Sequence, residues 1–171
     1  MNNKYPKGAE WRKWDLHVHT PNSVYQKYGS SNDTWEKYIS DLEGLSSEFA
    51  VVGINDYLFL DGYEKLAQEQ KTNGRVSNLT LLPVVEFRIE KFAGVDFGSL
   101  KRINLHVIFS NELTVETIRS QFLNTLEQSY LLEDGSAWSR AITVNSVAEL
   151  GAQIKASAPE GKRPKGNDLT V

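Results

Sequence analysis

The sequence predicts an α/β fold with a mainly parallel sheet. Segments with the apolar pattern of β-strands alternate along the chain with segments that carry apolar residues at helical spacing. Such an alternation is typical of a sheet covered by helices. The chain has 171 residues, of which 40% are hydrophobic and 24% are charged, as in globular proteins. We therefore expect a single domain over residues 1–171.

Four segments are expected to form the strands. In the first, residues 14–19 (WDLHVH), polar and apolar side chains alternate, so that Leu16 and Val18 face one side and the histidines face the other. The second, residues 49–54 (FAVVGI), is a continuous apolar run, which is typical of a buried parallel strand. The other two expected strands are residues 79–87 (LTLLPVVEF) and 103–109 (INLHVIF).

Helices are expected between and after these strands. The first follows the capping-box pattern at residues 33–36 and has apolar residues at helical spacing up to Leu45. The second covers residues 62–72, with Asn73-Gly74 as its stop signal. A third is expected over residues 114–126 and another over residues 144–156.

The two ends of the chain lack these patterns. We expect residues 1–13 to form an N-terminal arm and residues 158–171, which are polar, basic and rich in Pro and Gly, to form a flexible tail. Because no closing element follows the last expected helix, the chain is expected to be a piece of a longer domain.

Composition excludes several classes of site. The absence of cysteine excludes disulfides, thiolate zinc sites and a cysteine nucleophile. The net charge of −3 provides no global basic field for nucleic acid or anionic membranes. No apolar stretch approaches the ~20 residues that span a membrane, and the N-terminus lacks the apolar run of a signal peptide. A cytoplasmic location without membrane contact is the expectation.

Two of the three histidines lie one residue apart, in the first strand. His17 and His19 therefore face the same side, and imidazole is a ligand for Zn, Mn and Fe. Asp15 is expected on the same face, where it could orient a histidine. Taken alone, a His-x-His pair is a weak signal for a metal site.

Further ligand types follow the other strands. Asp56 comes directly after the second strand, Glu86 lies near the end of the third, and His106 lies within the fourth. Taken alone, each has a more ordinary explanation: Asp56 as a turn residue, Glu86 as a carboxylate that faces water, and His106 as a histidine in the core. Because an α/β sheet gathers its chemistry at the carboxyl ends of its strands, the residues together predict a divalent-metal site.

The same segments carry a family resemblance. WDLHVHT, GINDY, LLPVVEF and INLHVIF, in this order, resemble the motifs of the PHP (polymerase and histidinol phosphatase) superfamily. The region up to GINDYLFLDGYEKL is more specifically similar to TrlF-type PHP proteins, in which a PHP module precedes a large AAA-like or SMC-like ATPase. The resemblance covers roughly residues 8–126.

The resemblance implies a fold, a chemistry and a ligand set. The fold is an irregular (β/α)7 barrel, of which this chain would be the N-terminal part. The chemistry is hydrolysis of phosphomonoesters or phosphodiesters by divalent metal ions (Zn, Mn or Fe), with nucleic acid as one candidate substrate. The module would be linked to a C-terminal ATPase region of the parent protein. His17, His19, Glu86 and His106 match metal ligands, Glu86 as the bridging one, and Asp56 matches a ligand or supporting aspartate.

Two features depart from the family pattern. Tyr57 stands where most PHP members have a second-motif histidine. The family's later ligands, which include an Asp-x-His near the end of the barrel, have no counterpart after His106. Arg88 and Lys91 could contact a phosphate, although solvated loop charges are the more ordinary reading.

Two alternatives therefore remain open. One is an amidohydrolase-like metal-dependent hydrolase, because that superfamily also begins with His-x-His on its first strand. The glutamate of the third strand and the lack of a lysine within a strand favour the PHP pattern. The other is a degenerate PHP module without catalytic activity, which would act in structure or partner binding; Tyr57 and the missing late ligands favour it.

Overall fold

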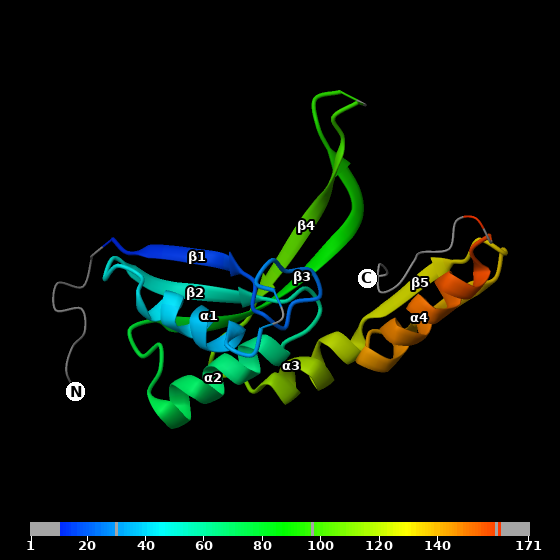
Figure 1. The fold of residues 1–171 in the computed structure, drawn as a ribbon. Coiled ribbons are helices and arrows are strands. Elements are labelled where there is room, and N and C mark those ends of the chain that lie inside the picture. The colour runs from blue at the N-terminus through cyan, green and yellow to red at the C-terminus, as the bar shows by residue number, and fades with distance from the viewer. Residues whose placement is uncertain (1–10, 30, 97, 160, 162–171) are drawn as a thin grey trace. The chain divides into compact units, whose positions relative to one another are not determined.

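The structure, a computed structural model, describes residues 11–29, 31–96, 98–159 and 161 (Figure 1). It is a mixed α/β fold that contains a curled sheet, as in half of a barrel, and four α-helices. Most of the expected arm (residues 1–13) and of the expected tail (residues 158–171) lies outside the described residues. Among the described residues, no helix is long and apolar enough to cross a membrane.

The curled sheet has four strands in the order β1-β2-β3-β4. The first three run parallel, as the sequence predicts, and β4 pairs with β3 in the antiparallel direction. Their bounds are β1 Lys13–Val18, β2 Phe49–Asn55, β3 Thr80–Ala93 and β4 Lys101–Ile108.

Strand β3 is longer than the sequence predicts. The expected strand ends at Phe87, but the backbone pairing with β4 continues to the pair Ala93 and Lys101 after a register shift between Arg88 and Phe92. The two strands form a long hairpin that projects away from β1 and β2 in Figure 1. An antiparallel hairpin needs no crossover helix, which is why no helix lies between these strands.

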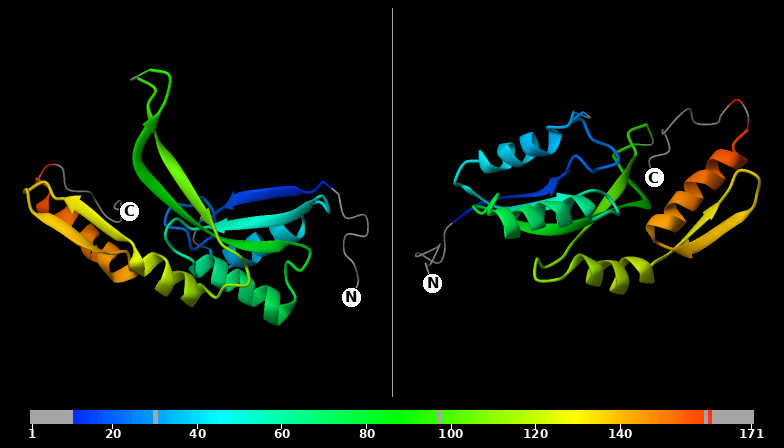
Figure 2. Two further views of the ribbon diagram at one scale, coloured as in Figure 1. Left: turned by 180° about the vertical axis from the view of Figure 1, so that it is seen from behind. Right: turned by 60° about the horizontal axis from the view of Figure 1, so that its bottom comes forward.

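Helices α1 (Thr34–Glu43) and α2 (Asp61–Asn73) lie on the same face of the sheet (Figure 2). Their buried side chains, which include Ile39 and Leu66, pack in the core of this layer with the apolar residues of β2 and β3. The expected capping box of α1 does not form, because Asp33 makes no side-chain hydrogen bond to the helix. Helix α2 ends as predicted, with Gly74 in the left-handed conformation (φ 69°).

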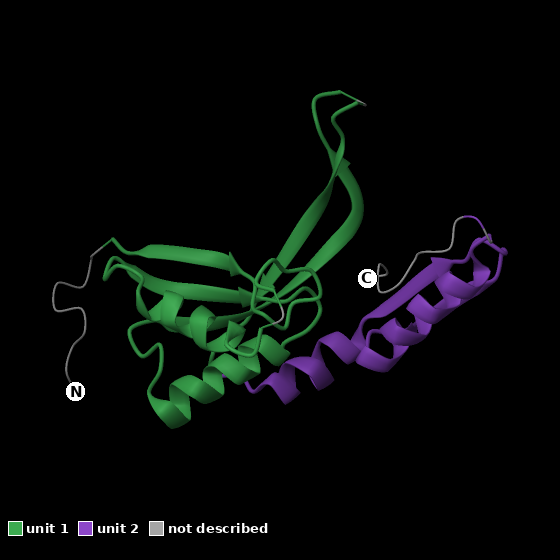
Figure 3. Cartoon of the chain, viewed as in Figure 1, with its two compact units in different colours: residues 1–111 green, residues 112–171 purple. Residues whose placement is uncertain are grey.

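The chain divides into two compact units, residues 1–111 and residues 112–171 (Figure 3). The sheet and helices described above belong to the first. The second contains two helices, a 3-10 turn and a two-stranded sheet around a small core of Leu132, Trp138, Leu150 and Ile154. Its elements are α3 Val115–Gln121, η1 Leu123–Thr125, β5 Glu127–Leu131, β6 Ala137–Ala141 and α4 Val144–Ser157.

The second unit differs from its prediction in two respects. The helix expected over residues 114–126 is shorter, because the backbone leaves the helical conformation at Phe122 (φ −124°, ψ −69°). The hairpin of β5 and β6 is not predicted, because polar and apolar residues do not alternate in β5 (EQSYL). In the structure every residue of β5 is exposed. The helix expected over residues 144–156 is present as α4, with a capping box between Thr143 and Ser146.

Candidate metal centre

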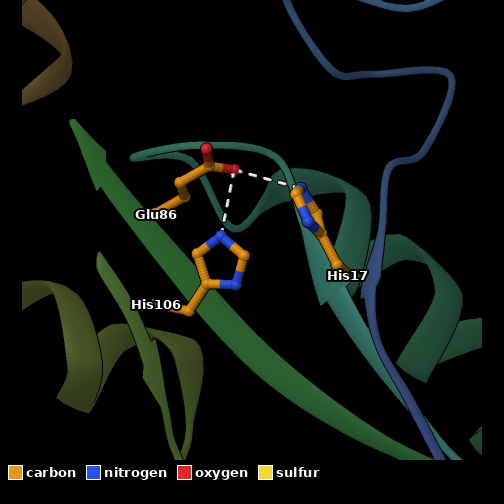
Figure 4. A group of neighbouring side chains, drawn as sticks. All are labelled: His17, Glu86 and His106. Atoms are coloured by element: carbon orange, nitrogen blue, oxygen red, sulfur yellow. Dashed lines mark ion pairs between the residues drawn. The ribbon is translucent and has the colours of Figure 1, made fainter. Parts of the chain in front are cut away.

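Three side chains from three strands of the first unit converge at one point (Figure 4). His17 of β1, Glu86 of β3 and His106 of β4 each offer one ligand atom, and these atoms all lie within 4.8 Å of one another. Nε2 of His17 lies 3.3 Å from Oε2 of Glu86, and Nε2 of His106 lies 3.6 Å from the same oxygen. The Glu86 side chain is almost fully buried, whereas that of His17 is about half exposed.

Backbone register brings these side chains together. Glu86 and His106 are direct partners in the antiparallel ladder, and such partners point to the same face of the sheet. On β1 the pairing with β2 shifts between Asp15 and Val18, as in a β-bulge. As a result Asp15 and Val18 line one recess against α1, whereas His17 reaches Glu86. The strict alternation expected for residues 14–19 is therefore wrong.

A glycine in β2 allows this irregular strand to approach. A Cβ atom on Gly53 would lie 2.8 Å from the Cα and the carbonyl oxygen of Leu16, and 2.9 Å from Cγ2 of Val84. Side-chain atoms are essentially never found so close to backbone, so only glycine fits at this position.

Two asparagines hold the buried carboxylate of Glu86. Nδ2 of Asn55 donates to Oε2 over 2.7 Å, and Nδ2 of Asn104 donates to Oε1. The backbone N–H of Glu86 donates to the carbonyl oxygen of Tyr57 over 2.9 Å. Both the strand and its side chain are therefore fixed, and Oε2 is directed to the two histidines.

The donors of this group fit a divalent metal ion. Nε2 of His106 is buried and has no hydrogen-bond partner among the described residues, which is costly unless a ligand occupies it. A metal–ligand distance of about 2.1 Å separates two ligands of a tetrahedral site by about 3.4 Å. The observed separations of 3.3 and 3.6 Å are close to this value. Imidazole nitrogen and carboxylate oxygen are both common ligands of first-row metal ions.

His19 lies beside this group. Its Nε2 is 3.2 Å from Nε2 of His17, and its Nδ1 is 3.1 Å from Oγ of Ser23. It is not a member of the group whose ligand atoms all lie within 4.8 Å. Burial, and next the charge of His17, lower the pKa of His19, which favours the neutral imidazole that binds metals.

Asp56 lies outside the group and supports the loop after β1. Its buried carboxylate accepts hydrogen bonds from the backbone N–H (2.8 Å) and the hydroxyl (2.6 Å) of Thr20, which follows His19. Burial raises the pKa of Asp56, and the hydrogen bonds from Thr20 oppose that rise. A Cβ atom on Gly62 would lie 2.0 Å from Oδ2 of Asp56, so glycine is needed where α2 begins.

The remaining candidate residues lie around the centre. Asp15 accepts a hydrogen bond from the backbone N–H of His17 (3.1 Å). The sequence analysis expects Asp15 to orient a histidine ring, whereas this contact is with the backbone. The exposed Arg88 is paired with Asn104, two residues along β3 from Glu86. The exposed Lys91 lies within the stretch where the register shifts.

Tyr57, next to the centre, has an unusual backbone conformation. Its φ of 59° is in the left-handed region, which is a strained conformation for an aromatic residue. Its ring lies 5.0 Å from that of His19. Burial, and next the charge of Glu86, raise the pKa of the Tyr57 phenol, so at neutral pH the hydroxyl keeps its proton and can donate a hydrogen bond.

The sequence analysis did not single out Asn55, Asn104 or Thr20. Asn104 could have been found, because it lies two residues before His106 in a strand and so faces the same side. Asn55 precedes Asp56 directly, but no local pattern indicates that the amide of Asn55, and not the carboxylate of Asp56, contacts Glu86.

No protein-family model, curated protein or solved structure matches the chain.

Proposed function

We propose that the chain is the N-terminal part of a PHP-type barrel and takes part in metal-dependent hydrolysis of phosphoesters. The observation that carries the proposal is the convergence of His17, Glu86 and His106, in which the buried Nε2 of His106 has no hydrogen-bond partner among the described residues. The ordered motifs that resemble the PHP superfamily supply the reaction class, and the substrate is a phosphomonoester or phosphodiester.

The protein groups around the centre have defined roles in this proposal. A divalent cation held there would supply Lewis-acid polarisation of a phosphoryl oxygen and activation of a water molecule. Glu86, His17 and His106 would hold the cation, while Asn55 and Asn104 orient Glu86.

Two groups at the edge of the centre suit an anionic substrate. Arg88 is exposed and lies two residues from Glu86, where its guanidinium can pair with phosphate oxygens. The protonated hydroxyl of Tyr57 can donate a hydrogen bond to a substrate oxygen. In the parent protein, we propose, the module acts beside an ATPase region, with nucleic acid as one candidate substrate.

Metal binding and hydrolysis can be tested separately. Chelator-treated protein is titrated with Zn²⁺, Mn²⁺ or Fe²⁺ by calorimetry, and hydrolysis of bis-p-nitrophenyl phosphate is followed with each metal. We expect binding of at least one ion, and the variant His106→Ala should weaken that binding by about 10- to 100-fold or more. The variant Asp134→Asn, which changes an exposed carboxylate of the second unit, is the matched control.

The outcomes distinguish the candidate functions. Metal binding with turnover that His106→Ala abolishes supports the phosphoesterase. Metal binding without turnover by protein that includes the natural C-terminal continuation supports the non-catalytic module. Absence of metal binding at neutral pH contradicts both the phosphoesterase and a non-catalytic module that binds metal.

A further inference from the structure

The recess lined by Asp15 and Val18 lies in the first unit, between β1, β2 and α1. It has a volume of about 240 Å³ and is partly open to solvent. Its apolar wall includes Phe49, Leu42 and Val52. This recess is distinct from the metal centre, because none of the three members of that group lines it.

The charges at the recess have one sign. Asp15 of β1 and Asp41 of α1 line it, and both residues are exposed, so their carboxylates can meet an incoming ligand. No lysine, arginine or histidine is among the residues that line it in the described part of the chain. An occupant with a positive charge would therefore be attracted and an anion repelled.

Two aromatic rings add to this chemistry. The rings of Tyr28 and Tyr38 lie 5.5 Å apart in a T-shaped arrangement, and both residues line the recess. Tyr38 is 4% exposed, and its hydroxyl has no hydrogen-bond partner among the described residues. Because this hydroxyl has almost no accessible surface, Tyr38 contributes its ring to the wall of the recess.

We propose that this recess binds a small organic cation, such as an amidinium, guanidinium or ammonium group on an apolar body. The apolar wall would take the body, and the two carboxylates would pair with the charge. Aromatic rings also attract cations through their faces. The volume suits a ligand about the size of a benzene ring with one substituent.

The recess is connected to the loop of the metal centre. The Tyr28 hydroxyl donates a hydrogen bond to the carbonyl oxygen of His19 over 3.0 Å. A cation that contacts Tyr28 would therefore contact a residue that is hydrogen-bonded to the backbone of His19.

The test uses a pair of probes with the same shape and different charge. The full chain, labelled with ¹⁵N, is titrated with benzamidine and, separately, with the neutral benzamide, and amide shifts are followed by NMR. Benzamidine should shift the signals of Tyr38, Leu42 and Val52. Benzamide should bind up to about fivefold more weakly, because an exposed ion pair contributes up to about fivefold in affinity.

Two variants locate the binding. Asp41→Asn should weaken benzamidine binding up to about fivefold, while Glu127→Gln, which removes an exposed charge of the second unit, should leave it unchanged. Equal affinity for both probes, unshifted recess signals or an ineffective Asp41→Asn variant would overturn the proposal.

Discussion

The centre depends on single side chains that are not themselves candidate ligands. Glu86 is 4% exposed, and the two asparagine amides bind both of its oxygens. Hydrogen bonds to a buried charged group contribute more to stability than those between neutral groups, and removing one partner leaves the other desolvated. Asn55 and Asn104 are therefore as important for the geometry of the centre as the histidines.

The variant Asn55→Ala tests this dependence. It removes the 2.7 Å hydrogen bond to Oε2 of Glu86 and should lower the free energy of unfolding by about 2 kcal/mol in metal-free protein. Urea denaturation in the presence of a chelator measures the change. The matched control Asn32→Ala, at an exposed turn, should change stability by less than about 0.5 kcal/mol. Equal effects of the two variants would show that the Asn55 amide is not needed.

The difference between Asp56 and Asn55 shows what the sequence could predict at this scale. Both residues follow or end the second strand. The prediction of a shared pocket for His17, Glu86 and His106 follows from their positions near the carboxyl ends of strands or within a neighbouring strand. Which neighbour contacts which depends on the bulge in β1 and on the register of β4. Neither of these features is encoded in a local pattern, so Asp56 contacts Thr20 while Asn55 contacts Glu86.

Among the elements, β1 and β2 are packed against each other with unusual closeness. The variant Gly53→Ala would place a Cβ atom 2.8 Å from the Leu16 backbone and should destabilise the protein by about 1–3 kcal/mol. Because the bulge of β1 carries His17, metal affinity should fall as well. The control Gly44→Ala meets ordinary contacts of 3.4 and 3.5 Å in a right-handed helical conformation and should be close to neutral. A Gly53→Ala protein with unchanged stability would contradict the close approach.

Helices α1 and α2 are joined by an ion-pair network centred on Arg75. Its guanidinium donates to Glu36 and to Glu43 of α1, and the shortest contact with each is 2.8 Å. The hydrogen bonds from Arg75 lower the pKa of both carboxyl groups below the ordinary value of 4.5. A carboxyl group whose pKa is lowered by folding stabilises the protein above its unfolded pKa, and this contribution disappears as the pH falls through the folded pKa.

The variant Arg75→Gln should therefore have a pH-dependent effect. At pH 7 its urea midpoint should lie below that of the wild-type protein, and the difference should shrink as the pH falls below about 4. Lys71→Gln, which removes one positive charge from the last turn of α2, is the control and should show little difference at either pH. A gap between Arg75→Gln and wild type that stays constant down to about pH 3 would contradict the role of the network.

At the scale of the whole molecule, the alternation of strands and helices predicts the first unit well. Strands β2 and β3 and helices α1 and α2 are where hydrophobic periodicity predicts them, because each buries apolar side chains. Strand β1 also lies where it is predicted, although none of its residues is fully buried. The second unit is predicted less well. Its hairpin is exposed along β5, and its small core depends on contacts between Trp138 of β6 and Leu150 of α4, far apart in sequence. Whether residues 1–171 act as one domain remains a prediction.

All three members of the metal-binding group belong to the first unit, which leads to a final prediction. A specific protease site inserted between Asn111 and Glu112, both exposed, allows the folded protein to be cut between its two units. Because residues 17, 86 and 106 remain in one fragment, metal should stay with that fragment at an affinity within about twofold of the uncut protein, a change smaller than 0.5 kcal/mol. Calorimetry before and after cleavage measures it, with the uncut insertion variant as control. Release of the metal on cleavage would show that the second unit is needed to hold the centre together.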